Sequence, residues 1–206
     1  MPPRPTHVFF DIGGVLGTNG WDSEQRAAAA ALYDLGSEFE PRHREIVGDW
    51  ELGRISADEY LDIAVFYEPR SFSRADFLAC MKDQSRPYAA SIALARRLAR
   101  EERVRLFTLN NESAELNQYR IEKYGLRDIF DAFLSSCWLG VRKPTQRIYT
   151  AALAIAQAPP EHSLFIDDRP QNLAPAAARG MQTILYENPE QLAAALQRSG
   201  LLGGEA

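Results

Sequence analysis

The chain has 206 residues, of which 46% are hydrophobic and 25% charged, with a net charge of −5. This length and composition indicate one domain, or one domain with an insertion, with enough apolar residues for a core. The negative charge argues against general binding to nucleic acid or anionic membranes. No stretch approaches the roughly 20 apolar residues of a membrane helix, and residues 1–6 do not resemble a signal peptide. We therefore expect a cytoplasmic protein with no nucleic-acid or membrane partner; its oligomeric state is not readable.

Short apolar runs closed by polar residues predict buried parallel strands. The clearest runs are 8–10, 104–109 and 164–166, and weaker ones are 133–135 and 183–186. Helical patterns at 113–124 and 145–156 fall between these strands. The alternation predicts an α/β fold, with a doubly wound parallel sheet as a Rossmann-like core.

The interval from residue 17 to residue 86 lacks a convincing strand. It contains four helix-like segments instead, at 22–35, 42–52, 57–66 and 73–82, with Ser23, Ser56 and Ser73 as candidate caps or first-turn residues. We predict that residues 1–16 and 87–206 form the α/β core. Residues 17–86 are predicted to form an inserted helical cap, which acts as a lid over the strand ends.

Polar residues close the three clearest strands. Asp11 follows the first, Asn110 follows the second, and Asp167 and Asp168 follow the third. An Asp after an apolar run is often only a cap or a turn residue. In a doubly wound sheet, however, ligands bind at the carboxyl ends of the strands, so these residues together predict a site there. Gly13 and Gly14 after Asp11 allow the backbone to approach a ligand or metal closely.

The order of four segments resembles the four motifs of the haloacid dehalogenase-like (HAD) hydrolase superfamily. These segments are FFDIGGVL, LFTLNNES, GVRKPTQRIY and LFIDDRPQNL, and the resemblance covers nearly the whole chain. ELGRISADEYL is similar to a recurrent cap sequence of this group, and Asn172 with 179–181 matches the continuation after the last motif. The resemblance implies a subfamily I helical cap and a D-x-G-x-V branch similar to sugar 1-phosphate phosphatases.

The resemblance implies a Mg²⁺-dependent phosphatase of small phosphorylated metabolites, sugar phosphates among them. Asp11 would be the nucleophile that forms an aspartyl phosphate, and Lys143 would place a positive charge on the phosphoryl group. Such chemistry requires a cation to offset repulsion between carboxylate and phosphate, and fixed donors for the phosphate oxygens. The expected Mg²⁺ ligands are Asp11, the backbone carbonyl near Gly13, and Asp167 or Asp168; the expected phosphate-binding residues are Asn110, Asn111 and Lys143.

Gly13 marks a departure from the family pattern. Many phosphatases of this superfamily carry a second Asp at this position, two residues after the nucleophile, as general acid and base. General acid catalysis typically contributes about 10²–10⁴-fold, and glycine supplies none of it. A sugar 1-phosphate needs less general acid catalysis, because its anomeric oxygen leaves more easily than the oxygen of a simple alcohol.

Two alternative functions follow from the same residues. One is a catalytically weak or non-catalytic homologue that binds a phosphorylated ligand, and the other is a 2-haloacid dehalogenase. Dehalogenation needs no metal, so the pair Asp167 and Asp168 argues against it.

Substrate choice is expected to depend on the cap. Its candidate residues are Trp21, Asp22, Arg26, Trp50, Arg54 and Tyr60. Three histidines, His7, His43 and His162, lack ligand spacing, and we expect them on the surface or in the core. Cys80 and Cys137 lack metal-binding spacing, so we expect two reduced thiols.

Overall fold

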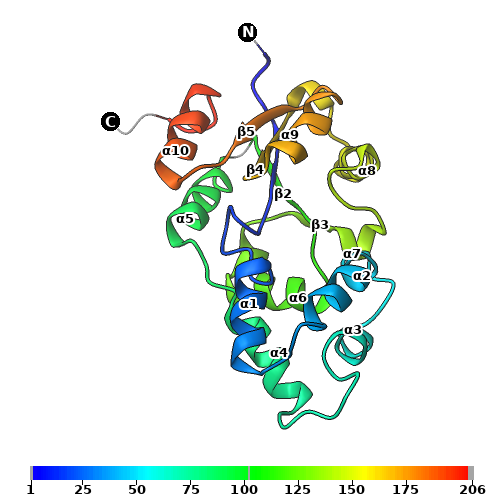
Figure 1. The fold of residues 1–206 in the computed structure, drawn as a ribbon. Helices are drawn as coiled ribbons and strands as arrows, with labels where there is room; N and C mark the ends of the chain where they lie inside the picture. The colour runs from blue at the N-terminus through cyan, green and yellow to red at the C-terminus, as the bar shows by residue number, and fades with distance from the viewer. Residues whose placement is uncertain (1, 102, 204–206) are drawn as a thin grey trace.

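A computed structural model describes residues 2–101 and 103–203 (Figure 1). Five parallel strands form one sheet in the order β3-β2-β1-β4-β5. They are β1 (His7–Phe10), β2 (Arg105–Asn110), β3 (Ala132–Ser135), β4 (Ser163–Asp167) and β5 (Gln182–Leu185). All five predicted strands are confirmed, with each boundary within one residue of its expected place. This strand order confirms the doubly wound α/β core.

Helices cover both faces of the sheet. The core helices are α5 (Ala89–Leu98), α6 (Ala114–Lys123), α7 (Ser136–Leu139), α8 (Gln146–Ala156), α9 (Pro170–Ala177) and α10 (Pro189–Arg198), with short 3₁₀ turns at Leu126–Asp128 and Pro160–His162. Val8 and Phe10 of β1 pack in one apolar cluster with residues of α5 and α10. Phe9 packs in a second cluster with residues of α8 and α9. Alternate residues of the strand therefore face opposite layers, which explains its uninterrupted apolar sequence.

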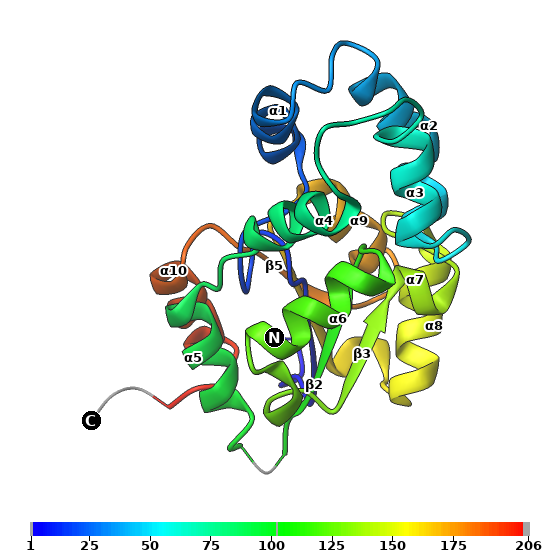
Figure 2. The ribbon, with the colours of Figure 1, turned by 90° about the horizontal axis from the view of Figure 1, so that it is seen from below.

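Four helices lie between β1 and α5 in the sequence. They are α1 (Ser23–Leu32), α2 (Phe39–Glu51), α3 (Ala57–Ala64) and α4 (Arg74–Asp83). Figures 1 and 2 show them gathered at one end of the molecule, beyond the strands. They share an apolar cluster, which includes Trp21, Phe39, Trp50, Tyr60 and Phe77 and also Leu116 of α6. Within the described ranges, no helix combines the length and apolar character needed to cross a membrane.

Local capping explains where these helices begin. Ser56 and Ser73 each cap a helix through a capping box, in which the carboxylate of Glu59 or Asp76 accepts a hydrogen bond from the backbone amide of the cap residue. Asp22 caps α1, so Ser23 is the first residue of that helix.

Two connections join the four-helix segment to the rest of the chain, and they lie side by side. The Thr18 amide donates to the Arg86 carbonyl over 2.9 Å, and the Tyr88 amide donates to the Leu16 carbonyl over 2.8 Å. The segment therefore leaves and re-enters the α/β layers at one place, next to the residues that follow β1.

Candidate active site

The carboxyl ends of β1 and β4 bring three carboxylates together. Phe10 pairs with Ile166 in the parallel ladder, and the amide of Asp11 donates to the Ile166 carbonyl over 2.9 Å. Asp11 follows β1, Asp167 ends β4 and Asp168 comes next. One oxygen atom of each of these carboxylates lies within 4.8 Å of the others. The arrangement concentrates negative charge at the sheet edge where doubly wound folds bind ligands.

Lys143 lies among these carboxylates. Its Nζ is 2.9 Å from Oδ2 of Asp11 and 2.6 Å from Oδ2 of Asp167. The residue is only 3% exposed, so its charge acts in a poorly solvated environment. Asn111 holds the backbone of Lys143 by accepting from its amide and donating to its carbonyl, each over 2.9 Å. The ammonium group is thus fixed beside the predicted nucleophile.

Asp167 and Asp168 differ in how their oxygens are used. Oδ1 of Asp167 accepts from the Arg169 amide and from Asn172, each over 2.9 Å, and its Oδ2 accepts from Lys143. Oδ1 of Asp168 is buried and has no hydrogen-bond partner among the described residues. Buried polar atoms are rarely left unpaired, and a carboxylate oxygen is a ligand that Mg²⁺ prefers. The donor set of Asp11 and Asp168 therefore fits a hard divalent cation.

Burial and neighbouring charges shift the pKa values of Asp11, Asp168 and Lys143. Burial raises the pKa of Asp11 to about 7, with Lys143 opposing the shift and the charge of Asp167 adding to it. Burial also raises the pKa of Asp168, and the charge of Asp167 contributes. Burial acts to lower the pKa of Lys143, but the charges of Asp11 and Asp167 outweigh it and raise this pKa above its usual value. Crowded carboxylates of this kind favour binding of a cation.

Gly14 allows Asp168 to lie against the loop after β1. Its φ is +77°, and a Cβ atom at this position would overlap the Asp168 carboxylate. Glycine meets both requirements, because it adopts positive φ readily and leaves the space empty.

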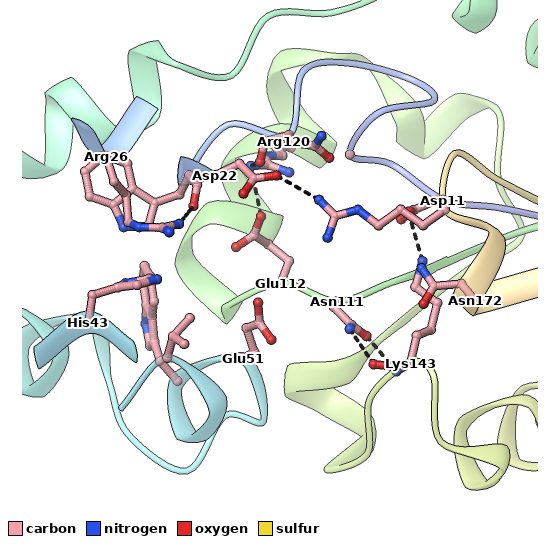
Figure 3. Close-up of a pocket in the computed structure, with 16 residues that line it drawn as sticks. Asp11, Asp22, Arg26, His43, Glu51, Asn111, Glu112, Arg120, Lys143 and Asn172 are labelled. Atoms are coloured by element: carbon pink, nitrogen blue, oxygen red, sulfur yellow. Dashed lines mark hydrogen bonds and ion pairs between the residues drawn. The ribbon is translucent and has the colours of Figure 1, made fainter. Parts of the chain in front are cut away.

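A cavity of about 220 Å³ has Asp11 in its wall (Figure 3). The α/β layers contribute Asp11, Gly13, Asn111, Glu112, Arg120, Lys143, Arg169 and Asn172 to its wall. The other wall residues come from the chain after β1 and from α1 and α2, and they are Asn19, Trp21, Asp22, Arg26, His43, Val47, Trp50 and Glu51. Ion pairs at 2.8 Å between Asp22 and Arg169, and at 2.9 Å between Glu51 and Arg142, join the two sides.

Four of the six candidate cap residues, Trp21, Asp22, Arg26 and Trp50, line this cavity. Arg54 does not; it is exposed and pairs with Asp49. Tyr60 is buried in the cap, where its hydroxyl accepts from Trp21 Nε1 over 2.9 Å and lies 2.8 Å from Nδ1 of His43. His43, which the sequence placed only on the surface or in the core, is buried and belongs to the cavity wall.

The position of Asn110 differs from the expectation. Its amide nitrogen donates to Asn117 over 2.9 Å, and its Oδ1 accepts from the Ser135 hydroxyl over 2.7 Å. Asn110 is 1% exposed and is not part of the cavity wall. Its side chain is therefore used to join β2, β3 and α6, so the predicted contact with phosphate is corrected. The side chain of Asn111 does reach the cavity, but it holds the backbone of Lys143.

Glu112 and Arg120 also line the cavity, and the sequence did not single them out. They form a buried ion pair, with 2.9 Å between Arg120 Nη2 and Glu112 Oε2. Burial raises the pKa of Glu112, while the guanidinium of Arg120 opposes that shift. The sequence does contain a signal for the burial of Arg120. It lies four residues after Leu116, so both residues fall on the buried face of α6.

A family model described as haloacid dehalogenase-like hydrolase matches residues 5–180. Mouse bifunctional epoxide hydrolase 2 is 42% identical over 59 residues, which cover 29% of this chain and 11% of that protein. The chain thus spans only a small part of that relative. Sesquiterpene phosphatase astK of Aspergillus oryzae is 29% identical over 180 residues, which cover 84% of this chain and 86% of the relative.

The fold is also similar to a solved structure. A HAD family enzyme from Bacteroides thetaiotaomicron, in complex with magnesium and inorganic phosphate, superimposes with a TM-score of 0.75 at 19% identity. The match covers 89% of this chain and 94% of that one. Since the family model spans most of the chain, the protein belongs to the haloacid dehalogenase-like hydrolases.

Proposed function

We propose that the chain is a Mg²⁺-dependent phosphatase of small phosphorylated metabolites, acting through a phosphorylated Asp11. The observation that carries this proposal is the cluster of Asp11, Asp167 and Asp168 around Lys143, in which one buried Asp168 oxygen has no partner within the described part of the chain. The two relatives whose names or complexes mention phosphatase or phosphate support the same chemistry.

In this proposal Asp11 accepts the phosphoryl group and Lys143 stabilises its charge. An oxygen of Asp11 forms a bond to phosphorus while the bond to the leaving oxygen breaks, and water later attacks phosphorus to release phosphate and restore Asp11. Lys143 stabilises the charge on the equatorial oxygens, from a position that Asn111 fixes. Mg²⁺ bound by Asp11, Asp168 and the backbone near Gly13 would offset the repulsion between the carboxylates and the phosphate.

Asp167 has a different role from Asp168. Its oxygens already accept hydrogen bonds from Lys143, Asn172 and the Arg169 amide. We propose that Asp167 orients Lys143, whereas Asp168 provides a direct Mg²⁺ ligand.

Residues 17–86 serve as the cap that closes over the substrate. Trp21, Arg26 and Trp50 supply part of the cavity wall from this segment. The cavity volume of about 220 Å³ is below the roughly 300–1,000 Å³ of pockets for drug-sized ligands, which favours a small substrate.

Parallel assays separate this function from its alternatives. Purified protein is incubated with a panel of phosphomonoesters and with 2-haloacids, in Mg²⁺ and in EDTA, while phosphate and halide release are measured. Phosphate release that requires Mg²⁺ is expected. Halide release in EDTA would identify a dehalogenase, and no release of either product, together with Mg²⁺-dependent phosphate binding measured by calorimetry, would identify a non-catalytic binder.

A further inference from the structure

The space beside Gly13 is occupied by two other residues. A Cβ atom at Gly13 would lie 2.9 Å from Oδ1 of Asn19 and 3.7 Å from Nη1 of Arg120. A side chain at position 13 would therefore extend towards the guanidinium of Arg120. In related phosphatases, this position holds the acid that serves the leaving oxygen. In this chain a buried cation occupies the same region.

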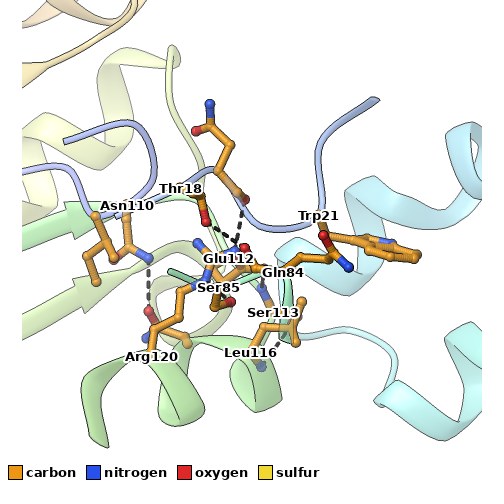
Figure 4. Close-up of polar contacts among 12 residues, drawn as sticks. Thr18, Trp21, Gln84, Ser85, Asn110, Glu112, Ser113, Leu116 and Arg120 are labelled. Atoms are coloured by element: carbon orange, nitrogen blue, oxygen red, sulfur yellow. Dashed lines mark hydrogen bonds and ion pairs between the residues drawn. The ribbon is translucent and has the colours of Figure 1, made fainter. Parts of the chain in front are cut away.

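The surrounding backbone and side chains hold Arg120 in place (Figure 4). Its Nε donates to the hydroxyl of Ser85 over 3.1 Å, and its Nη2 donates to the Asn19 carbonyl over 2.9 Å. Gly20 has a φ of +70°, and a Cβ atom there would overlap Nη2 of Arg120. The loop after β1 thus folds around the guanidinium, which is fixed before any ligand binds.

One nitrogen of this guanidinium remains available. Among the described residues, Nε and Nη2 of Arg120 have hydrogen-bond partners, whereas Nη1 has none. Arg120 is 2% exposed, yet it belongs to the wall of the cavity that contains Asp11. An N–H donor of a largely buried side chain that lines a cavity has its main opportunity for a partner in a bound ligand.

Glu112 is the nearest rival for the role of proton donor. Its Oε2 pairs with Arg120 and its Oε1 accepts from the Ser113 amide over 3.0 Å. Both oxygens act as acceptors, which is the arrangement of an ionised carboxylate. Its function here is to anchor Arg120.

We propose that Arg120 contacts the leaving oxygen and stabilises its negative charge through Nη1, in place of the acid that Gly13 does not provide. This inference rests on the proposed phosphatase function. As the bond between phosphorus and the leaving oxygen breaks, both electrons stay on that oxygen, and Nη1–H donates a hydrogen bond to it. Water then supplies the proton, because a guanidinium does not release one below about pH 12, and the hydroxide that remains attacks phosphorus of phosphorylated Asp11 in the next step.

The test compares esters with good and poor leaving groups. Values of kcat/KM for 4-nitrophenyl phosphate and ethyl phosphate are measured for the wild type, Arg120→Met and Arg120→Lys. Arg120→Met should lower the value for ethyl phosphate by about 10²–10³-fold, but that for 4-nitrophenyl phosphate by less than about 10-fold. Arg120→Lys keeps the charge, so its loss on ethyl phosphate should be intermediate. Arg127→Met, at an exposed arginine, is the matched control and should change neither value.

The outcomes separate this role from the phosphatase function itself. Equal losses on both esters in Arg120→Met would show that Arg120 acts only structurally, through its contacts with Ser85 and Asn19. No turnover of either ester by wild type with Mg²⁺ would contradict the phosphatase function, and the role of Arg120 with it.

The wild type gives a second test that does not depend on the folding of any variant. Above about pH 7.5 both esters are dianions, since the second phosphate pKa is about 6. The ratio of the two kcat/KM values should then stay constant up to about pH 9.5, because a hydrogen bond from a guanidinium requires no proton transfer in this range. A fall in the rate on ethyl phosphate relative to 4-nitrophenyl phosphate would reveal a titrating acid, such as Glu112, and would overturn the proposal.

Discussion

Asn111 and Lys143 form two reciprocal hydrogen bonds between a side chain and a backbone. The carboxamide oxygen of Asn111 accepts from the amide of Lys143, and its amide nitrogen donates to the carbonyl of Lys143, each over 2.9 Å. Because these bonds fix the backbone, the ammonium group can stay between Asp11 and Asp167. The residue after β2 thereby sets the geometry of a residue from a different loop.

Replacing Asn111 by alanine should lower activity without removing any group that reacts. Loss of both bonds leaves Lys143 less well placed, and a displacement of about 1 Å can lower a rate by about 10²-fold. We expect kcat/KM for phosphomonoesters to fall by roughly 10- to 100-fold while the circular dichroism spectrum is unchanged. Gln118→Ala removes an exposed side-chain hydrogen bond from α6 and should leave the rate unaltered. An unaltered rate in Asn111→Ala would contradict this role.

Gly14→Ala should be more damaging than the same change at Gly36. Both glycines have positive φ, +77° and +71°, but only Gly14 lies against Asp168, whereas nothing lies within 4 Å of a Cβ at Gly36. Gly36→Ala therefore measures the backbone strain alone, about 1 kcal/mol. We expect Gly14→Ala to lose about 1–3 kcal/mol more in the free energy of unfolding, measured with urea. Equal losses would mean that the loop has room beside Asp168.

Asparagine substitutions should distinguish Asp168 from Asp167. Asp168→Asn removes a ligand oxygen, so Mg²⁺ affinity measured by calorimetry should fall by at least about 10-fold, while stability in EDTA is retained. Asp167→Asn deprives buried Lys143 of a close counter-charge and should lower the free energy of unfolding by about 3 kcal/mol. If Asp167→Asn removed Mg²⁺ binding and Asp168→Asn did not, the assignment of the two residues would be reversed.

His43 should make the folded state sensitive to mild acid. Burial lowers its pKa to about 4, while a histidine in an unfolded chain titrates near 6.5. As pH falls from about 6.5 towards 4, His43 binds a proton in the unfolded chain but stays neutral in the folded chain. The free energy of unfolding should then fall by at most about 1.4 kcal/mol per pH unit, and this loss should be complete below the folded pKa.

Glutamine in place of His43 isolates this effect. His43→Gln removes the titration while keeping a polar group near the Tyr60 hydroxyl, so its stability should depend less steeply on pH than that of the wild type. Glu40 titrates in a different range, because its hydrogen bond with Arg26 lowers its pKa to about 2, and it acts only below about pH 4.5. Parallel stability curves for wild type and His43→Gln between pH 6.5 and 4.5 would contradict the buried neutral state of His43.

The sequence predicted the strands and their terminal carboxylates because both depend on local patterns. A buried parallel strand needs an unbroken apolar run, and Asp11 and Asp167 follow directly from where two such runs stop. Asn110 also ends a strand, yet its side chain is taken up by Asn117 and Ser135, which tertiary packing brings to it. No sequence pattern reveals which of several neighbouring donors a buried amide will meet.

Several residues of the cavity wall could not be predicted from the sequence either, because tertiary packing places them there. Glu112 and Arg120 face the cavity only because α6 buries one side against the loop that follows β1. His43 joins the wall because α2 contributes residues to it.

The helix α10 was not predicted individually, although Asn188 followed by Pro189 is a readable start signal.

The turnover number of Asp11→Asn tests the central claim most directly. Asn111 and Lys143 remain in place in this variant, and asparagine keeps the size of the side chain, but an amide cannot accept the phosphoryl group. With Mg²⁺ and the best phosphomonoester of the panel, kcat should fall by at least about 10⁴-fold relative to wild type. Asp49→Asn, at an exposed carboxylate, serves as the control and should retain full activity. A folded Asp11→Asn protein with kcat within a few-fold of wild type would contradict the account.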